Sequence, residues 1–117
     1  MTNSLDFQAI RRALEEQITF LRDRIARDEA YLRTPAGPNP DHFDLAQAQI
    51  TREQRAVTLA QTRQQLAQIE IALQRLDDGT YGQCAQCGEP IEPGRLSVLP
   101  YASLCVRCQA KQETLAE

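Results

Sequence analysis

The distribution of glycine and proline constrains this sequence most strongly, because both residues interrupt helices. Neither occurs in residues 1–34 or 41–78, whereas residues 35–40 (PAGPNP) contain three Pro and one Gly. Residues 79–117 hold the remaining four Gly, three Pro and all four Cys. This distribution predicts a helix, a turn, a second helix and then a small loop-rich module.

Apolar residues recur with helical spacing in both breaker-free segments. The stripe in the first segment consists of Ile10, Leu14, Ile18, Leu21, Ile25 and Leu32. The second segment carries a heptad-like seam that is polar at Arg52, Arg55 and Thr62; its other members are Leu45, Ala48, Leu59, Leu66, Ile69, Leu73 and Leu76. Such seams are typical of coiled coils. Because the linker between the segments is short, we expect a mainly α fold with a long antiparallel hairpin over residues 1–78 and its tip at about 34–46.

Four cysteines form two Cys-x2-Cys pairs separated by seventeen residues: Cys84, Cys87, Cys105 and Cys108. This spacing lets four thiolates surround one ion and is typical of zinc sites. Four thiolates leave no coordination position for a substrate, so we expect one structural Zn²⁺ per chain. Iron bound by the same ligands and disulfide bonds remain alternatives. Residues 79–117 would form a four-cysteine zinc finger, with a C-terminal helix from about Leu104 at the base of the hairpin.

The charge of the chain argues against a nucleic-acid-binding module. The formal net charge is −3, and residues 77–117 contain three basic and six acidic residues. Because binding to a phosphate backbone needs clustered positive charge, we expect no direct DNA binding. No apolar run reaches the roughly 20 residues of a membrane span, and the N-terminus lacks a signal-peptide core. We therefore expect a soluble, cytoplasmic protein without a membrane partner.

Two acidic residues lie where the second helix should begin. Asp41 follows Pro40 and can cap the helix, while Asp44 falls at the third helical position, where the helix dipole favours negative charge. A helix needs only one cap, however. Both interpretations therefore stay open: two ordinary capping residues, or two carboxylates presented to a partner.

Two motifs, in this order along the chain, resemble the DksA/TraR family. The segment Asp41-His-Phe-Asp44-Leu-Ala46 is similar to the Asp-x-x-Asp-x-Ala coiled-coil tip of that family. Residues 72–109 are similar to its C4 zinc finger, and the matching positions are Gly79, Gly82, Gly88, Ile91, Arg95, Leu96, Pro100 and both Cys pairs. The resemblance extends over nearly the whole chain.

This resemblance implies a transcription regulator that binds bacterial RNA polymerase. In the family, the coiled coil enters the secondary channel, and the acidic tip near the active site changes the stability of open promoter complexes in the stringent response. By match, Asp41, Asp44 and Ala46 are the polymerase-modulating tip, and the four cysteines are the zinc ligands. The resemblance implies no catalytic residue, so we expect a regulator and not an enzyme. Because the seam next to the tip is polar, we expect no dimerisation through the coiled coil and therefore a monomer.

The sequence departs from longer family members where guanosine tetraphosphate (ppGpp) is expected to bind. Those members place basic side chains on the lower second helix and the C-terminal helix. Here the positions are rich in glutamine, with Gln61, Gln64, Gln65, Gln68 and Gln109. Neutral amides bind phosphate less well than Arg or Lys do. We therefore do not expect dependence on ppGpp, although Arg63, Arg95 and Lys111 could still contribute to binding it.

Two other functions fit parts of the same sequence. A zinc-stapled coiled-coil adaptor with another protein partner would use Asp41 and Asp44 only as caps. A zinc-finger DNA-binding protein would use the Cys module, but its acidic balance disfavours this. Loss of activity that follows loss of stability would favour the adaptor, and a salt-sensitive shift of promoter DNA would favour the DNA-binding protein.

Overall fold

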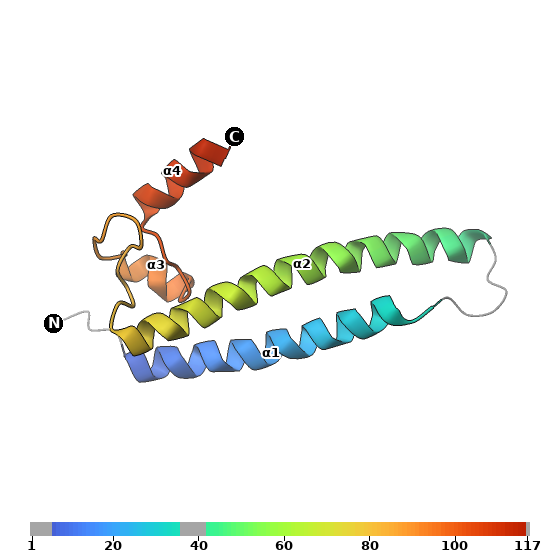
Figure 1. Ribbon diagram of the computed structural model, residues 1–117, viewed down its shortest axis with the longest axis horizontal. Coiled ribbons are helices and arrows are strands. Elements are labelled where there is room, and N and C mark those ends of the chain that lie inside the picture. The colour runs from blue at the N-terminus through green and yellow to red at the C-terminus, as the bar shows by residue number, and fades with distance from the viewer. Residues whose placement is uncertain (1–5, 36–41, 117) are drawn as a thin grey trace. The chain divides into compact units, whose positions relative to one another are not determined.

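The computed structural model describes residues 6–35 and 42–116 (Figure 1). Their secondary structure is almost entirely helical, which confirms the mainly α fold. The helices are α1 (Phe7–Arg33), α2 (His42–Asp78), α3 (Pro93–Val98) and α4 (Val106–Ala116). Within the described residues β-structure is limited to one isolated antiparallel bridge, between Gln83 and Pro90. Helix α3 was not predicted from the sequence; it begins at Pro93, whose fixed φ suits a first helical position.

The ends of α1 are set by local side-chain chemistry. Its first turn is capped by Asp6, whose Oδ1 accepts a hydrogen bond of 3.1 Å from the backbone N–H of Ala9. At the other end, the Thr34 hydroxyl donates to the carbonyl oxygen of Ala30 at 2.8 Å. The helix therefore ends at Arg33, just before Pro35, as the breaker pattern predicts.

Helix α2 also follows the breaker pattern. It begins at His42, shortly after Pro40, and ends at Asp78, immediately before Gly79. Beyond its end, the backbone N–H groups of Thr80 and Tyr81 donate to the carbonyl oxygen of Arg75 at 2.9 and 3.1 Å. These bonds satisfy a carbonyl of the last turn that has no partner within the helix.

The chain divides into two compact units. The finger unit comprises Met1–Ile18 and Ala67–Glu117, and the hairpin unit comprises Thr19–Leu66. Within each unit a segment of α1 lies beside a segment of α2 with the opposite chain direction (Figure 1). Helices α3 and α4 belong to the finger unit.

The core of the finger unit is apolar. Leu14 and Ile69 are fully buried where α1 lies beside α2, and Ile91 and Leu96 are 2% and 4% exposed. Tyr81 closes this core: its ring meets that of Phe7 edge-on, with centroids 5.9 Å apart, and its hydroxyl donates to the Pro100 carbonyl oxygen at 2.7 Å. Burial raises the pKa of Tyr81. Burying each large aliphatic side chain contributes roughly 1.5–3 kcal/mol.

The core of the hairpin unit is partly polar. Leu21 and Leu59 are buried, but so are Thr62 and Asp28, at 5% and 6% exposure. Leu45, which the sequence placed in the seam, is 44% exposed. Leu45 nevertheless faces the end of α1, because it lines a pocket together with Leu32 and Arg52. The seam therefore continues at this end of α2, but it is exposed to solvent. No helix of the described residues combines the length and apolarity that a membrane crossing requires.

Candidate metal centre and helix tip

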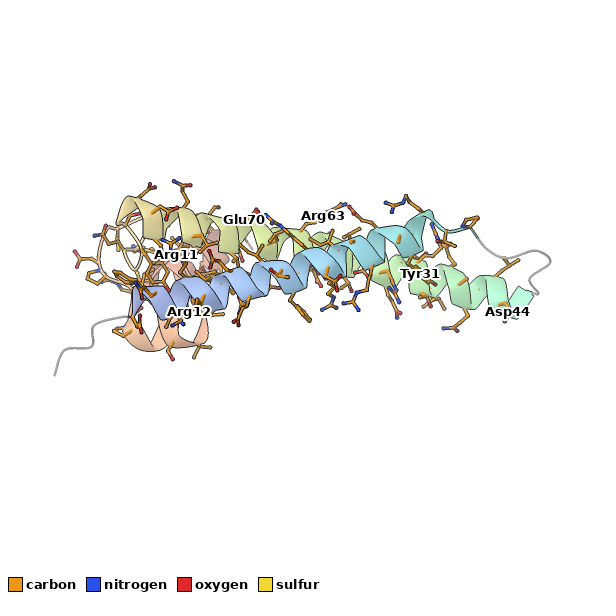
Figure 2. The ribbon with its side chains drawn as sticks, turned by 90° about the horizontal axis from the view of Figure 1, so that it is seen from below. Arg11, Arg12, Tyr31, Asp44, Arg63 and Glu70 are labelled. Atoms are coloured by element: carbon orange, nitrogen blue, oxygen red, sulfur yellow. The ribbon has the colours of Figure 1, made fainter. Side chains whose placement is uncertain are left out.

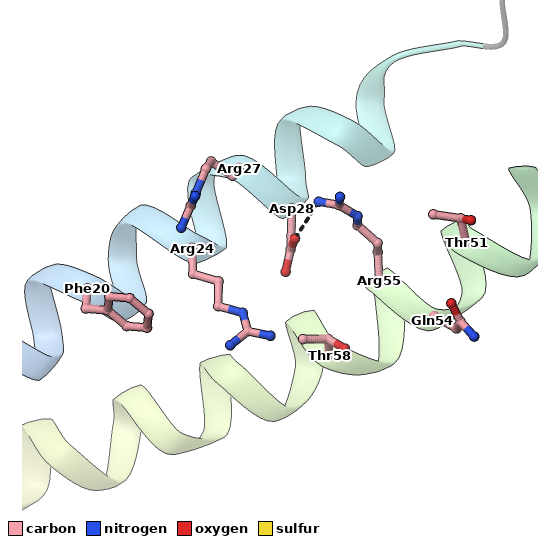
Figure 3. A pocket seen from close by; sticks show the side chains of 8 residues that line it. All are labelled: Phe20, Arg24, Arg27, Asp28, Thr51, Gln54, Arg55 and Thr58. Carbon is pink, nitrogen blue, oxygen red and sulfur yellow. Dashed lines mark hydrogen bonds and ion pairs between the residues drawn. The ribbon is translucent and has the colours of Figure 1, made fainter.

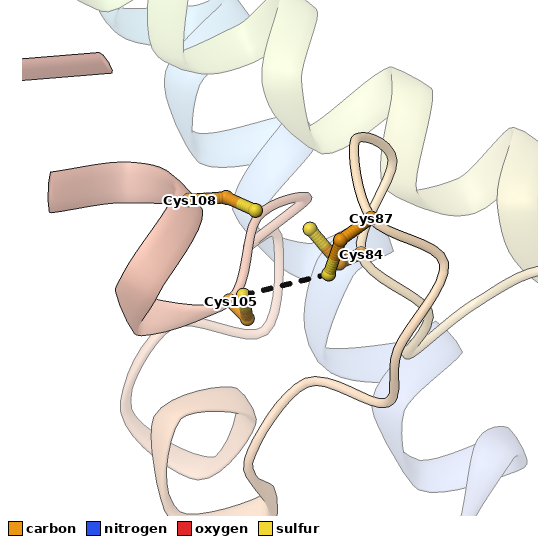
Figure 4. Close-up of side chains that lie close together, drawn as sticks. All are labelled: Cys84, Cys87, Cys105 and Cys108. Carbon is orange, nitrogen blue, oxygen red and sulfur yellow. Dashed lines mark hydrogen bonds between the residues drawn. The ribbon is translucent and has the colours of Figure 1, made fainter. Parts of the chain in front are cut away.

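The four cysteine sulfur atoms converge in the finger unit (Figure 4). All four lie within 4.8 Å of one another, and the Sγ atoms of Cys87 and Cys105 are 3.9 Å apart. A tetrahedral zinc with Zn–S bonds of about 2.3 Å holds its sulfur ligands about 3.8 Å apart. Cys87 is exposed and the other three cysteines are buried. The donor set and its dimensions therefore fit one zinc ion.

A tight backbone turn presents the first cysteine pair. The N–H of Cys84 donates to the Glu89 carbonyl at 2.8 Å, and the N–H of Gly88 donates to the Cys84 carbonyl at 3.0 Å. Gly82 and Gly88 flank the pair with φ values of 86° and 78°. These left-handed conformations are strained for residues with a Cβ, which explains glycine at both positions.

The second cysteine pair lies at the start of α4. Gln109 N–H donates to the Cys105 carbonyl at 2.9 Å, as a first helical hydrogen bond. The N–H of Ala85 donates to the Ser103 carbonyl at 2.8 Å and joins the two cysteine loops. Arg95 Nε donates to the Leu104 carbonyl at 3.0 Å. Backbone contacts thus support the sulfur cluster from both sides.

Hydrogen bonds within the cluster shift the pKa values of two cysteine thiols in opposite directions. Backbone hydrogen bonding, first from Cys87 and then from Cys105, lowers the pKa of Cys84 to about 6. Hydrogen bonding to the Cys84 sulfur raises the pKa of Cys108 to about 12. One thiolate therefore forms readily and is stabilised by its neighbours. A bound divalent cation favours the thiolate form of all its ligands, so metal binding releases protons.

Two of the three expected tip residues, Asp44 and Ala46, lie at the start of α2. Asp44 is exposed in its first turn, at the third helical position, as the sequence predicts (Figure 2). The negative charge is favourable there because of the helix dipole. Ala46 is exposed two residues later. Asp41, the third expected tip residue, lies outside the described residues.

The polar seam of the hairpin unit contains an ion pair that the sequence analysis missed. Asp28 Oδ1 accepts a hydrogen bond of 3.0 Å from Arg55 Nη1, and the Arg55 guanidinium lies 4.3 Å from the centre of the Tyr31 ring. Asp28 occupies the seam position between Ile25 and Leu32, where the apolar stripe skips one step. The missing apolar residue at Asp28, together with Arg55 in the seam of the other helix, could have indicated this ion pair from the sequence.

Arg52 contributes a second contact between α1 and α2. Its Nη2 donates to the Leu32 carbonyl at 2.6 Å, and its Nη1 donates to the Thr34 carbonyl at 3.3 Å. The side chain therefore satisfies carbonyl groups at the end of α1 that no helical N–H can reach. The sequence located Arg52 in the seam but gave no indication of its partners.

The cationic groups considered for ppGpp lie in different settings. Arg63 forms an ion pair with Glu29, and Arg95 is engaged with the Leu104 carbonyl. Arg95 also lines a pocket of about 330 Å³ in the finger unit, whose other lining residues are Gln68, Leu99, Tyr101, Ala102, Ser103, Gln109 and Glu113. Lys111 is exposed on α4. The pocket thus presents one guanidinium, one carboxylate and two neutral amides.

Comparisons with known proteins agree with this architecture. Residues 79–113 match the prokaryotic dksA/traR C4-type zinc finger. The chain is 30% identical over 115 residues to the RNA polymerase-binding transcription factor DksA of Escherichia coli K12. This alignment covers 98% of this chain and 74% of the relative. It is 37% identical over 76 residues to the protein of the same name from Caulobacter vibrioides NA1000, which covers 62% of this chain and 54% of the relative. The match thus spans about half the length of the Caulobacter protein. The solved structure of transcription factor DksA2 from Pseudomonas aeruginosa superposes with a TM-score of 0.76 at 33% identity, covering 94% of this chain and 84% of that chain.

Proposed function

This chain belongs to the DksA/TraR family, and we propose on that basis that it is a transcription regulator that binds bacterial RNA polymerase. The observation that carries the proposal is the similarity to E. coli DksA, which extends over 98% of the chain. An RNA polymerase partner would place the protein in the cytoplasm. The regulator would act on the polymerase and catalyse no reaction itself.

In this proposal the finger is a structural element. Cys84, Cys87, Cys105 and Cys108 would hold one Zn²⁺, which supplies folding energy to this module. The chain itself contributes the two turns and the backbone bond from Ala85 to Ser103 that bring the sulfurs together. We retain residues 79–117 as the zinc-finger module and residues 1–78 as the coiled coil.

The coiled coil would deliver its tip into the secondary channel of the polymerase. Asp41, Asp44 and Ala46 would then lie near the active site and change open-complex stability. The exposure of Asp44 and Ala46 on an ordered helix supports this role. A side chain on a preformed helix reaches a partner with little loss of conformational entropy.

We further propose that the protein regulates as a monomer and without ppGpp, so that any role in the stringent response would not require the nucleotide. Arg63 and Arg95 already have intramolecular partners, and Glu113 lies in the same pocket as Arg95. The neutral Gln68 and Gln109 provide weak phosphate ligands.

A coiled-coil adaptor is the second candidate, and one observation favours it. Asp44 lies in the first turn of α2, where the helix dipole alone accounts for an acidic residue. In that case the substitution Asp44→Asn would reduce helix stability slightly and would leave transcription unchanged. A DNA-binding role has less support, because the finger carries an excess of acidic residues.

Binding to purified core RNA polymerase tests the proposal directly. We expect saturable binding of the zinc-loaded chain, and competition for the same site by E. coli DksA. The variant Asp44→Asn should still bind, because the contacts of the tip with the active site are expected to modulate activity more than affinity. A folded, zinc-loaded chain that neither binds the polymerase nor competes would contradict the proposal.

A further inference from the structure

A groove in the hairpin unit has no role in the proposed function. It has a volume of about 610 Å³ and lies between α1 and α2 (Figure 3). Three arginines line it together with one buried carboxylate; the full set is Phe20, Arg24, Arg27, Asp28, Thr51, Gln54, Arg55 and Thr58. The groove is therefore cationic overall, although the whole chain carries a net charge of −3.

The unusual atom in this groove is Oδ2 of Asp28. The carboxylate is 6% exposed; Oδ1 is bonded to Arg55, and Oδ2 is buried without a hydrogen-bond partner. A buried carboxylate oxygen without a hydrogen-bond donor is energetically unfavourable. Such an atom in a native protein calls for a specific explanation, such as a bound ligand or water. A group that occupies the groove must therefore donate a hydrogen bond to Asp28.

The surrounding cations add a second requirement. Arg24 extends from α1 toward Thr58 of α2, and Asp28 points into the same space (Figure 3). Arg27 lies on the same wall and forms an exposed ion pair with Asp23 at 3.5 Å. Guanidinium groups prefer oxyanions, with which they form charge-assisted hydrogen bonds. The occupant should therefore be an anion that also carries a proton.

We propose that this groove binds a protonated oxyanion of the phosphate type. The P–O–H group donates to Asp28 Oδ2, and the anionic oxygens accept hydrogen bonds from Arg24 and from the free side of Arg55. Hydrogen phosphate satisfies both requirements at neutral pH, whereas sulfate carries no proton and would be repelled by Asp28. The proposal does not depend on polymerase binding.

The test is a titration of the full zinc-loaded, ¹⁵N-labelled chain with sodium phosphate or sodium sulfate at constant ionic strength and neutral pH. We expect phosphate to shift the amide signals near Arg24 and Asp28. Its dissociation constant should be about ten-fold lower than that of sulfate, because phosphate forms one additional charge-assisted hydrogen bond. Glycerol phosphate at about pH 6, where a phosphomonoester also retains a proton, shows whether the phosphate can be part of a larger molecule.

Three variants make the test specific. Asp28→Asn keeps an oxygen for Arg55 and replaces the repelling oxygen by a donor, so the preference for phosphate over sulfate should disappear. Arg24→Gln changes only an exposed side chain and should weaken phosphate binding about ten-fold. Arg12→Gln, an exposed arginine of the finger unit, is the matched control and should leave binding unchanged. Equal binding of phosphate and sulfate by the parent, no binding of either, or an equal loss with Arg12→Gln and Arg24→Gln would overturn the proposal.

Discussion

At the level of single residues, the ion pair between Asp28 of α1 and Arg55 of α2 links the two helices within their polar seam. The carboxylate is almost fully removed from water, whereas the Arg55 side chain is 41% exposed and also stacks on Tyr31. A buried charge with one good partner is stable only while that partner remains. A second ion pair between α1 and α2 in this unit, formed by Arg63 and Glu29, is far more exposed.

Loss of Arg55 should therefore be more damaging than loss of Arg63. The substitution Arg55→Ala leaves Asp28 buried without a donor, and we expect the free energy of unfolding to fall by about 1–3 kcal/mol. Arg63→Ala breaks an exposed pair and should lower it by no more than about 1 kcal/mol. Urea unfolding of the zinc-loaded variants measures both values. If both substitutions lowered the free energy of unfolding equally, the burial of Asp28 would not make its ion pair with Arg55 more important than the exposed pair.

At the scale of elements, the helix boundaries depend on different kinds of information. The breakers Pro35, Pro40 and Gly79 predicted three of the four ends of α1 and α2, because these residues act through local backbone geometry. The contact of Arg52 with the end of α1 could not be predicted in this way. It joins residues 18 and 20 positions apart, and only the antiparallel arrangement brings them together.

The same distinction applies to the metal site. The spacing of the cysteines predicted the cluster, because a two-residue gap directs both thiolates of a pair to one ion. The seventeen residues between the pairs then only have to bring the second pair back to the first. Helix α3 lies inside that longer segment and was missed. Its six residues are too few to show a helical apolar period. The sequence correctly predicted Asp44 at the third position of α2. Its role could not be predicted in the same way, because that role depends on contacts with a partner molecule.

The end of α1 should fray when Arg52 is removed. In Arg52→Met the apolar stem remains, but the Leu32 and Thr34 carbonyls lose their donors. We expect amide hydrogen exchange to become several-fold faster in the last turn of α1, with the finger unit unchanged. Arg33→Met, at an exposed neighbouring position, is the control. Unchanged exchange in the Arg52 variant would show that these hydrogen bonds do not hold the helix end.

At the scale of the whole molecule, charge is unevenly divided between the two units. The hairpin unit contains seven basic and six acidic residues, whereas the finger unit contains six basic and ten acidic residues. The negative excess of the chain therefore belongs to the finger unit, and a zinc ion with four thiolates would add to it. This division disfavours DNA binding by the finger unit, because binding to a phosphate backbone needs clustered positive charge.

Removal of zinc should selectively unfold the zinc-finger module, residues 79–117 of the finger unit. With the metal gone, Cys84 and its neighbours can no longer be held together as thiolates, and the module loses its main source of folding energy. We expect a chelator, or the substitution Cys84→Ser, to abolish exchange protection around Ile91 and Leu96. Protection around Leu59 in the hairpin unit should persist. An unchanged melting profile after verified zinc removal would show that the metal is not structural.

In vitro transcription from a ribosomal RNA promoter shows whether the chain regulates RNA polymerase through its acidic tip. The assay compares the zinc-loaded parent with Asp44→Asn, each with and without ppGpp, after circular dichroism has shown equal helicity. We predict that the parent lowers transcription without ppGpp and that Asp44→Asn does not. A parent without effect in either condition, or an Asp44→Asn variant that regulates as strongly as the parent, would contradict the account.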